Sequence, residues 1–192
     1  LTLSISAETG SVVEVFDGST SLGTATEGGT EGTFSFTTEA LGEGDHSFTV
    51  TATDAAGNTS TASPAAAVTI DTVAPGTPTL SLATDTGDDA ADGITRDATV
   101  AVNGLEADAD WEYSTNSGTD WSAGSGSSFE LAEGSYTAGN VQVRQTDVAG
   151  NTSAAGRIDT ALEIDTTVPA TLALALSSDT GSDSSDGITR DG

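Results

Sequence analysis

Residues Val141–Asn151 read VQVRQTDVAGN, and this stretch contains the two signals that decide the fold. Val141 and Val143 alternate with polar residues, which is the period of a β-strand that buries one face. The strand pattern ends in a DVAGN turn, because Asp, Asn and Gly tolerate the backbone angles that tight turns need. The same turn occurs 93 residues earlier, since Asp54–Ser60 reads DAAGNTS and Asp147–Ser153 reads DVAGNTS. The sequence therefore predicts a repeated unit of strands and turns.

Two further motifs repeat at an offset of 94 residues. The stretch Ile70–Pro75, IDTVAP, recurs as IDTTVP at Ile164–Pro169. The stretch Asp85–Asp97, which begins with DTG and ends with DGITRD, recurs at Asp179–Asp191. A repeat of about 94 residues built from strands and turns has the size of a seven-strand immunoglobulin-like sandwich. We therefore expect an all-β fold, with tandem immunoglobulin-like β-sandwiches in a linear array.

Alternating apolar residues mark strands elsewhere in the chain, and the enrichment in Thr and Val suits the pleated surface of a sheet. No stretch shows an apolar stripe of helical period over a helical length. The strand candidates are Val13–Phe16, Phe34–Phe36, Phe48–Ala52, Val100–Val102, Trp111–Tyr113, Phe129–Leu131 and Val141–Val143.

The repeat also predicts where one sandwich ends and the next begins. Leu3 and Ile5 align with Val100 and Val102, so the first sandwich is expected to begin at its second strand, B. A short linker stiffened by proline follows each sandwich. The expected organisation is a sandwich of strands B to G at 1–70, a linker at 71–75, a complete sandwich at 76–164, a second linker at 165–169, and the first strand and A–B loop of a third, incomplete repeat at 170–192.

The chain of 192 residues has 30 acidic and 4 basic residues, a formal net charge of −26. Nucleic acid and anionic membrane surfaces are poor partners, because both bind clustered Lys and Arg. No apolar run is long enough to span a bilayer. The lack of Cys excludes thiol catalysis, disulfides and Cys-based zinc sites, and it is compatible with an exported protein. A catalytic triad has only His46 to use, so we expect no enzymatic activity.

The loop Asp85–Asp97 holds five aspartates in 13 residues. Calcium takes six to eight oxygen ligands, and closely spaced carboxylates in a Gly-containing loop supply such ligands. This concentration of negative charge would be repulsive without a cation. The loop therefore predicts a Ca²⁺ site, although its spacing is not that of an EF-hand.

Sandwich topology brings further acidic residues to the same places. The F–G turn, with Asp147, is expected to face the preceding linker and Asp71, whereas the A–B loop, with Asp85, faces the following linker and Asp165. Calcium is therefore expected at the acidic interdomain junctions, where it would rigidify the array. The candidate ligands are Asp54, Asp71, Asp85, Asp88, Asp89, Asp92, Asp147, Asp165, Asp179 and Asp186. For the turns at Asp54 and Asp147, a hairpin turn without metal is an equally open interpretation.

Taken together, these motifs resemble the bacterial immunoglobulin-like repeats of large secreted adhesins of the repeats-in-toxin and biofilm-associated type. The resemblance is carried by the DTxxP linkers, the DTG…DGIT loop, the segment Trp111–Trp121 and the VQVRQTDVAGN stretch. It implies a surface-exposed or extracellular extender, placed between a membrane-proximal anchor and distal domains that bind the adhesion ligand. It also implies that calcium stiffens the array and that the direct partners are adjacent repeats of the same chain.

Two other functions stay open. The chain could be a ligand-binding module for a carbohydrate or a protein, which exposed Trp111 or Trp121 on a concave face would favour. It could also be a metal-free spacer of a secreted enzyme. Core or half-buried packing is the favoured interpretation of both tryptophans.

Overall fold

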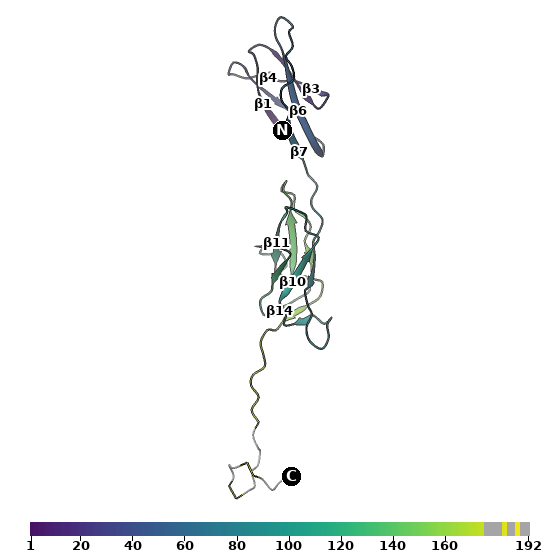
Figure 1. Ribbon diagram of the computed structural model, residues 1–192, viewed down its shortest axis with the longest axis vertical. Helices are drawn as coiled ribbons and strands as arrows, with labels where there is room; N and C mark the ends of the chain where they lie inside the picture. The colour runs from purple at the N-terminus through teal and green to yellow at the C-terminus, as the bar shows by residue number, and fades with distance from the viewer. Residues whose placement is uncertain (175–181, 184–186, 189–192) are drawn as a thin grey trace. The chain divides into compact units, whose positions relative to one another are not determined.

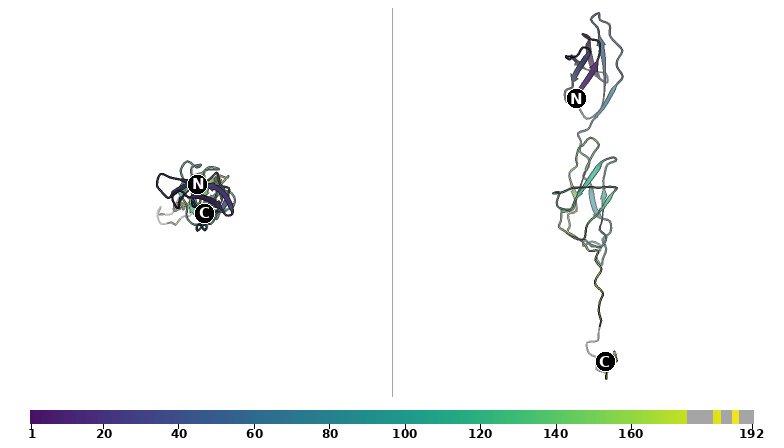
Figure 2. Two further views of the ribbon diagram at one scale, coloured as in Figure 1. Left: turned by 90° about the horizontal axis from the view of Figure 1, so that it is seen from above. Right: turned by 90° about the vertical axis from the view of Figure 1, so that its left-hand side faces the viewer.

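The computed structural model describes residues 1–174, 182–183 and 187–188, and Figures 1 and 2 show its ribbon from three directions. Every regular element in these residues is a β-strand. The described residues include no helix of the length and apolarity that a membrane span requires. The prediction of an all-β fold is therefore confirmed.

Seven strands precede residue 71 and form two sheets. One sheet has the order β1-β5-β4 and the other has the order β3-β2-β6-β7. Their bounds are β1 Thr2–Ser6, β2 Val12–Asp17, β3 Thr20–Thr24, β4 Thr26–Glu27, β5 Thr33–Thr37, β6 Gly44–Thr53 and β7 Ala66–Ile70.

The core of this first sandwich comes from alternate residues of strands in both sheets. Ile5 of β1 pairs with Phe34 of β5, and Val15 of β2 pairs with Val50 of β6. Ile5, Val13, Val15 and Phe34 are buried together. Because side chains of a strand point to opposite faces in turn, this period-2 pattern places one face of each sheet in the core.

Ten strands follow between residues 79 and 164 of the described chain, and they form three sheets. The orders are β13-β10-β8, β12-β11-β15-β16 and β14-β17-β9, and β17 pairs with β9 in parallel. Their bounds are β8 Thr79–Leu82, β9 Ile94–Thr95, β10 Thr99–Asn103, β11 Asp110–Ser114, β12 Ser122–Ala123, β13 Ser128–Glu130, β14 Gly134–Tyr136, β15 Gln142–Thr146, β16 Gly156–Arg157 and β17 Leu162–Ile164.

The second sandwich contains both tryptophans of the chain. Trp111 is buried, and the rings of Tyr113 and Phe129 stack with centroids 4.3 Å apart. Trp121 is half-buried, and its indole N–H donates to the Gly118 carbonyl over 3.0 Å. Both tryptophans therefore pack within the fold, as predicted, and neither offers an open aromatic platform.

Two compact units make up the chain, and they do not follow the sheets. The first comprises Leu1–Thr77, Leu105–Trp111 and Arg144–Ala154, and the second comprises Pro78–Gly104, Glu112–Val143 and the chain from Ala155 onward. Within the first unit, the buried Gln145 joins two segments that are far apart in the sequence. Its amide nitrogen donates to the Gly76 carbonyl over 2.7 Å, and its amide oxygen accepts from the Glu106 N–H over 2.8 Å.

Within the second unit, β8 approaches β16 so closely that only glycine fits at position 156. A Cβ atom added to Gly156 would lie 1.8 Å from the Pro78 carbonyl oxygen. Since the obstacle is backbone, it cannot rotate away as a flexible side chain would. Gly156 is thus required by the packing of strand A, the first strand of this sandwich.

Gly156→Ala is expected to destabilise the second sandwich by about 1–3 kcal/mol, the usual cost of overpacking. Thermal unfolding followed by circular dichroism should show the lower midpoint. Gly76→Ala is the matched control, because nothing lies within 4 Å of the added Cβ. Equal midpoints for Gly156→Ala and the unchanged protein would contradict this account of the packing.

Candidate functional site

The turn Asp54–Asn58 is closed by its own carboxylate. Asp54 Oδ1 accepts from the N–H groups of Ala56 and Asn58 at 2.9 and 2.8 Å, and Oδ2 accepts from the Asn58 amide at 2.7 Å. Gly57 has a φ of 89°, in the left-handed region that glycine favours. The Asn58 side chain, followed by the backbone donors, lowers the pKa of Asp54 below its model-compound value of 3.8.

The turn Asp147–Asn151 repeats this geometry. Asp147 Oδ1 accepts from the Asn151 N–H at 2.8 Å, and Oδ2 accepts from the Asn151 side-chain amide at 2.9 Å. The Asn151 side chain is again the largest cause of a lowered pKa at Asp147. Both carboxylates thus have donors within their own turns, which is the arrangement that the hairpin interpretation requires.

The second turn also contacts the first linker. The Asn151 side-chain amide donates to the Asp71 carbonyl over 3.1 Å, and both residues belong to the first compact unit. The Asp71 carboxylate accepts from the Val73 N–H at 3.0 Å. The predicted neighbourhood of Asp71 and Asp147 is therefore present through Asn151, and the contact uses the backbone of Asp71.

The loop Asp85–Asp97 contains an unusual carboxylate. Asp85 Oδ2 accepts from the Gly93 N–H at 2.9 Å. Asp85 Oδ1, in contrast, is the one buried side-chain nitrogen or oxygen atom without a hydrogen-bond partner among the described residues. Burying a carboxylate oxygen without a donor is unfavourable. A cation is a fitting partner for this oxygen, so the residues present are compatible with calcium.

Asp88 and Asp165 line one polar depression of about 430 Å³ beside this loop. The Asp165 N–H donates to the Thr95 carbonyl over 3.0 Å, which places the second linker against the loop. Arg96 lines the same depression, so one fixed cation already faces these acids. Asp165 therefore lies beside the A–B loop, and it lines the same depression as Asp88.

The other acids of the loop point elsewhere. Asp85 lines a separate depression with Leu80 and Leu162, and Asp92 lines a third with Tyr136. Asp89 and Asp92 each accept the N–H two residues further on, at 3.1 and 2.9 Å. Residues 1–174, 182–183 and 187–188 contain no group of three or more His, Asp or Glu placed to hold one ion. Asp179 and Asp186 lie outside the residues that the structure describes.

Sequence reasoning missed a contact that holds both linkers. Glu43 Oε1 accepts from the Thr72 N–H at 2.8 Å and from the Thr72 hydroxyl. In the second sandwich, Glu133 accepts from the hydroxyls of Thr166 and Thr167 at 2.5 and 2.8 Å. These hydroxyls, Thr166 first, lower the pKa of Glu133. Each glutamate is followed by a glycine, and the two Glu-Gly pairs lie 90 residues apart. The linkers lie 94 residues apart, so the glutamates do not follow the repeat of the threonines that they bind.

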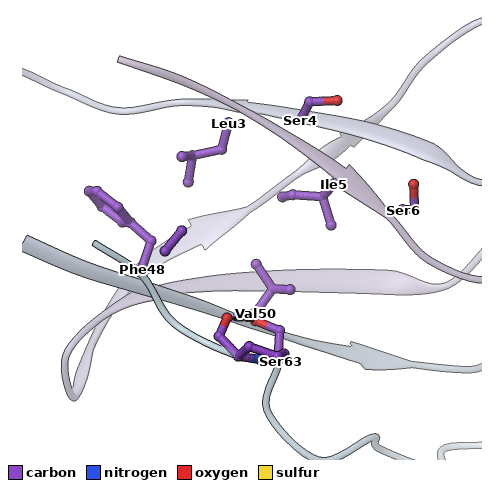
Figure 3. Close-up of a pocket in the computed structure, with 9 residues that line it drawn as sticks. Leu3, Ser4, Ile5, Ser6, Phe48, Val50 and Ser63 are labelled. Atoms are coloured by element: carbon purple, nitrogen blue, oxygen red, sulfur yellow. Dashed lines mark hydrogen bonds between the residues drawn. The ribbon is translucent and has the colours of Figure 1, made fainter. Parts of the chain in front are cut away.

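An apolar groove runs along β1 in the first sandwich (Figure 3), with a volume of about 240 Å³. The side chains of Leu3, Ile5, Phe48 and Val50 point toward one another across it. No charged residue lines the groove, so it offers neither metal ligands nor an acid–base pair. Strand β10 of the second sandwich aligns with β1 in the sequence repeat, and it lies between β13 and β8. Among the described strands, β1 pairs only with β5 and forms the edge of its sheet.

Comparison with known proteins gives a family match for part of the chain. Residues 1–72 match the family model of the bacterial Ig-like domain. The search of curated proteins found no match. Among solved structures, the fibronectin(III)-like modules of Clostridium thermocellum CbhA are similar over 91% of both chains, at 14% identity and a TM-score of 0.40. The prediction of an immunoglobulin-like β-sandwich is confirmed.

Asp54→Asn should make the melting midpoint depend less on pH under acidic conditions. Because the folded pKa of Asp54 lies below its model-compound value of 3.8, the carboxylate stabilises the fold above about pH 4. That contribution is lost as the pH falls through the folded pKa. Melting midpoints between pH 2 and pH 6 measure the effect, and Asp110→Asn, at an exposed strand residue, controls for the lost charge. A profile for Asp54→Asn that is parallel to that of the unchanged protein would rule out this role.

Proposed function

We propose that this chain consists of structural extender repeats of a bacterial surface adhesin of the repeats-in-toxin or biofilm-associated kind. In this role the chain is not an enzyme, it acts outside the cell or on its surface, and it supports adhesion or biofilm formation. Its partners are adjacent repeats, and the adhesion ligand is bound by other domains. The bacterial Ig-like match over residues 1–72 supports a module of structural type, since domains of this kind are typically non-catalytic.

Calcium is the proposed stiffening agent, and Asp85 carries this part of the proposal. Its buried Oδ1 has no donor, whereas Asp89 and Asp92 of the same loop each accept a backbone N–H group. A divalent cation would supply the missing positive partner, with further oxygens from Asp88, Asp92 and Asp165 after local rearrangement of the loop. Binding there would tie the second linker to the sandwich that precedes it.

Contacts of the second linker support this part of the proposal. Glu133 holds Thr166 and Thr167, and the backbone of β9 holds Asp165 through the Thr95 carbonyl. These contacts fix the chain at the exit of the second sandwich before any ion binds. Calcium would therefore add to an existing attachment, and its contribution would follow mass action.

The rival is a metal-free spacer, as in a secreted enzyme, and one observation favours it. Asp54 and Asp147 are fully engaged by their own turns, so these two carboxylates need no metal. The same observation makes them the weakest of the proposed calcium ligands. The groove in Figure 3 is the feature that a ligand-binding module would use, but it has no polar anchor beyond serine hydroxyls.

Saturating calcium is expected to raise the melting midpoint of protein treated with chelator. At free calcium of 100 times Kd, the gain is about 2.7 kcal/mol. Asp85→Asn should remove most of this gain, yet it should melt no lower than the unchanged protein in chelator, because it removes an unsatisfied buried charge. Asp159→Asn, at an exposed acid paired with Arg157 outside the loop, is the matched control. An identical midpoint with calcium and with chelator would refute the calcium proposal.

Asp165→Ala should weaken calcium binding while leaving the second sandwich folded. Asp165 is exposed and contributes its N–H to β9, a bond that alanine keeps. Isothermal titration calorimetry gives the affinity, and the dispersion of amide resonances reports the fold. Unchanged calcium affinity would exclude Asp165 from the site.

A further inference from the structure

The same set of contacts, which we call the hook, occurs at the start of β6 in the first sandwich and at β14 in the second. In each hook a ring side chain bonds a backbone carbonyl, and the glutamate after that carbonyl binds the linker. In the second, the Tyr136 hydroxyl donates to the Ala132 carbonyl over 2.9 Å, and the next residue, Glu133, holds the linker. In the first, His46 Nε2 lies 3.1 Å from the carbonyl of Gly42. Each ring residue thus bonds the carbonyl four residues earlier, immediately before the glutamate that binds the linker threonine.

Glu43 completes the first hook by binding Thr72 through its N–H and its hydroxyl. Gly42 and Glu43 are adjacent, so the carbonyl that His46 bonds belongs to the peptide unit that leads into Glu43. A displaced Gly42 carbonyl therefore changes where the Glu43 side chain begins. The position of the linker is in this way connected to the His46 ring.

The His46 ring is placed between two acceptors. Nδ1 lies 2.6 Å from Asp17 Oδ2, and Nε2 faces the Gly42 carbonyl. A carboxylate and a carbonyl both lack a proton to donate, and a neutral imidazole has a single N–H. Both contacts can form together only when the ring is the imidazolium, so His46 must be protonated in this arrangement.

The charged groups around the ring favour that protonated state. Asp17, at the end of β2, also accepts from the Ser47 N–H at 2.9 Å, which keeps it in place. Asp45 precedes His46 on β6, and its carboxylate accepts from the Thr69 hydroxyl of β7. On β7 the residue opposite His46 is the apolar Val68, and the Phe48 ring stacks on the imidazole with centroids 6.1 Å apart.

We propose that protonation of His46 controls the hook that attaches the first linker to its sandwich, through the Gly42 carbonyl and Glu43. With the ring protonated, the Gly42 carbonyl is bonded and Glu43 is held where it binds Thr72. When the ring loses its proton, Asp17 keeps the remaining N–H, the Gly42 carbonyl loses its donor, and the contact of Glu43 with Thr72 loosens. The second sandwich has the Tyr136 hydroxyl in place of the imidazole, so its linker is expected to stay attached over the same pH range.

The direction of the pH effect follows from the environment of the ring. The hydrogen bond to Asp17, then the Gly42 carbonyl, then the charges of Asp17 and Asp45 raise the pKa of His46 above 6.5. The stabilisation is therefore complete below pH 6.5 and is lost as the pH rises through the raised value. No hook contact uses a carboxylate proposed to bind calcium, and because Thr72 follows the candidate ligand Asp71, the test is made in chelator.

Nuclear magnetic resonance on the 192-residue chain in chelator tests this. The Thr72 amide should titrate with the same midpoint as the His46 ring protons, above pH 6.5, and its protection from hydrogen exchange should fall there. The amides of Thr166 and Thr167 should stay flat over that range. A Thr72 amide that is unmoved while His46 titrates would overturn the proposal.

Two variants separate the hook from a general effect of pH. His46→Tyr copies the second sandwich, and it should hold the Thr72 amide at its low-pH position throughout. Asp17→Asn should lower the His46 midpoint and shift the Thr72 midpoint by the same amount, which gives a second test if His46→Tyr fails to fold. A Thr72 titration that persists in His46→Tyr, or that stays in place in Asp17→Asn, would contradict the hook.

Discussion

The shortage of cations constrains the whole molecule, because 30 acidic side chains share 4 arginines and one histidine. Many carboxylates accept instead from backbone N–H groups or hydroxyl groups. Asp71, Asp89, Asp92, Asp97 and Asp165 each accept the N–H two residues further on. Each such bond closes a local turn, so the acids that carry the charge also shape the loops between strands. The glutamates that bind the linkers use threonine hydroxyls for the same reason.

Against this background the buried Asp85 Oδ1 stands apart, since Asp89, Asp92 and Asp97 of the same loop each accept a backbone N–H group. The absence of lysine has a second consequence at this point. Arg96 is the one fixed cation in the depression that Asp88 and Asp165 line in the described structure, and a guanidinium cannot supply the compact charge of a divalent ion. The proposed calcium ion would supply the compact positive charge that this carboxylate oxygen lacks.

The strands and the DxAGN turns could be predicted from the sequence, because both depend on local periodicity. Val141 and Val143 are buried where alternation places them, and Asp54 and Asp147 close equivalent turns. The Glu43–Thr72 contact could not be predicted, because it joins residues 29 positions apart and its two members repeat at different offsets. The unpartnered oxygen of Asp85 could not be predicted either, since the sequence shows which acids are present but not which of their oxygens lack donors.

The two sandwiches show how a repeated scaffold can carry different responses. The carbonyl at Gly42 or Ala132 and the glutamate after it form the same frame for the linker. What differs is the ring that closes the frame, an imidazole in one sandwich and a phenol in the other. Because the backbone frame is shared, exchanging the ring side chain changes the pH at which the hook loosens. The contact between the glutamate and the linker threonine stays the same. Neighbouring repeats of nearly the same fold can therefore differ in the conditions under which their linkers are free.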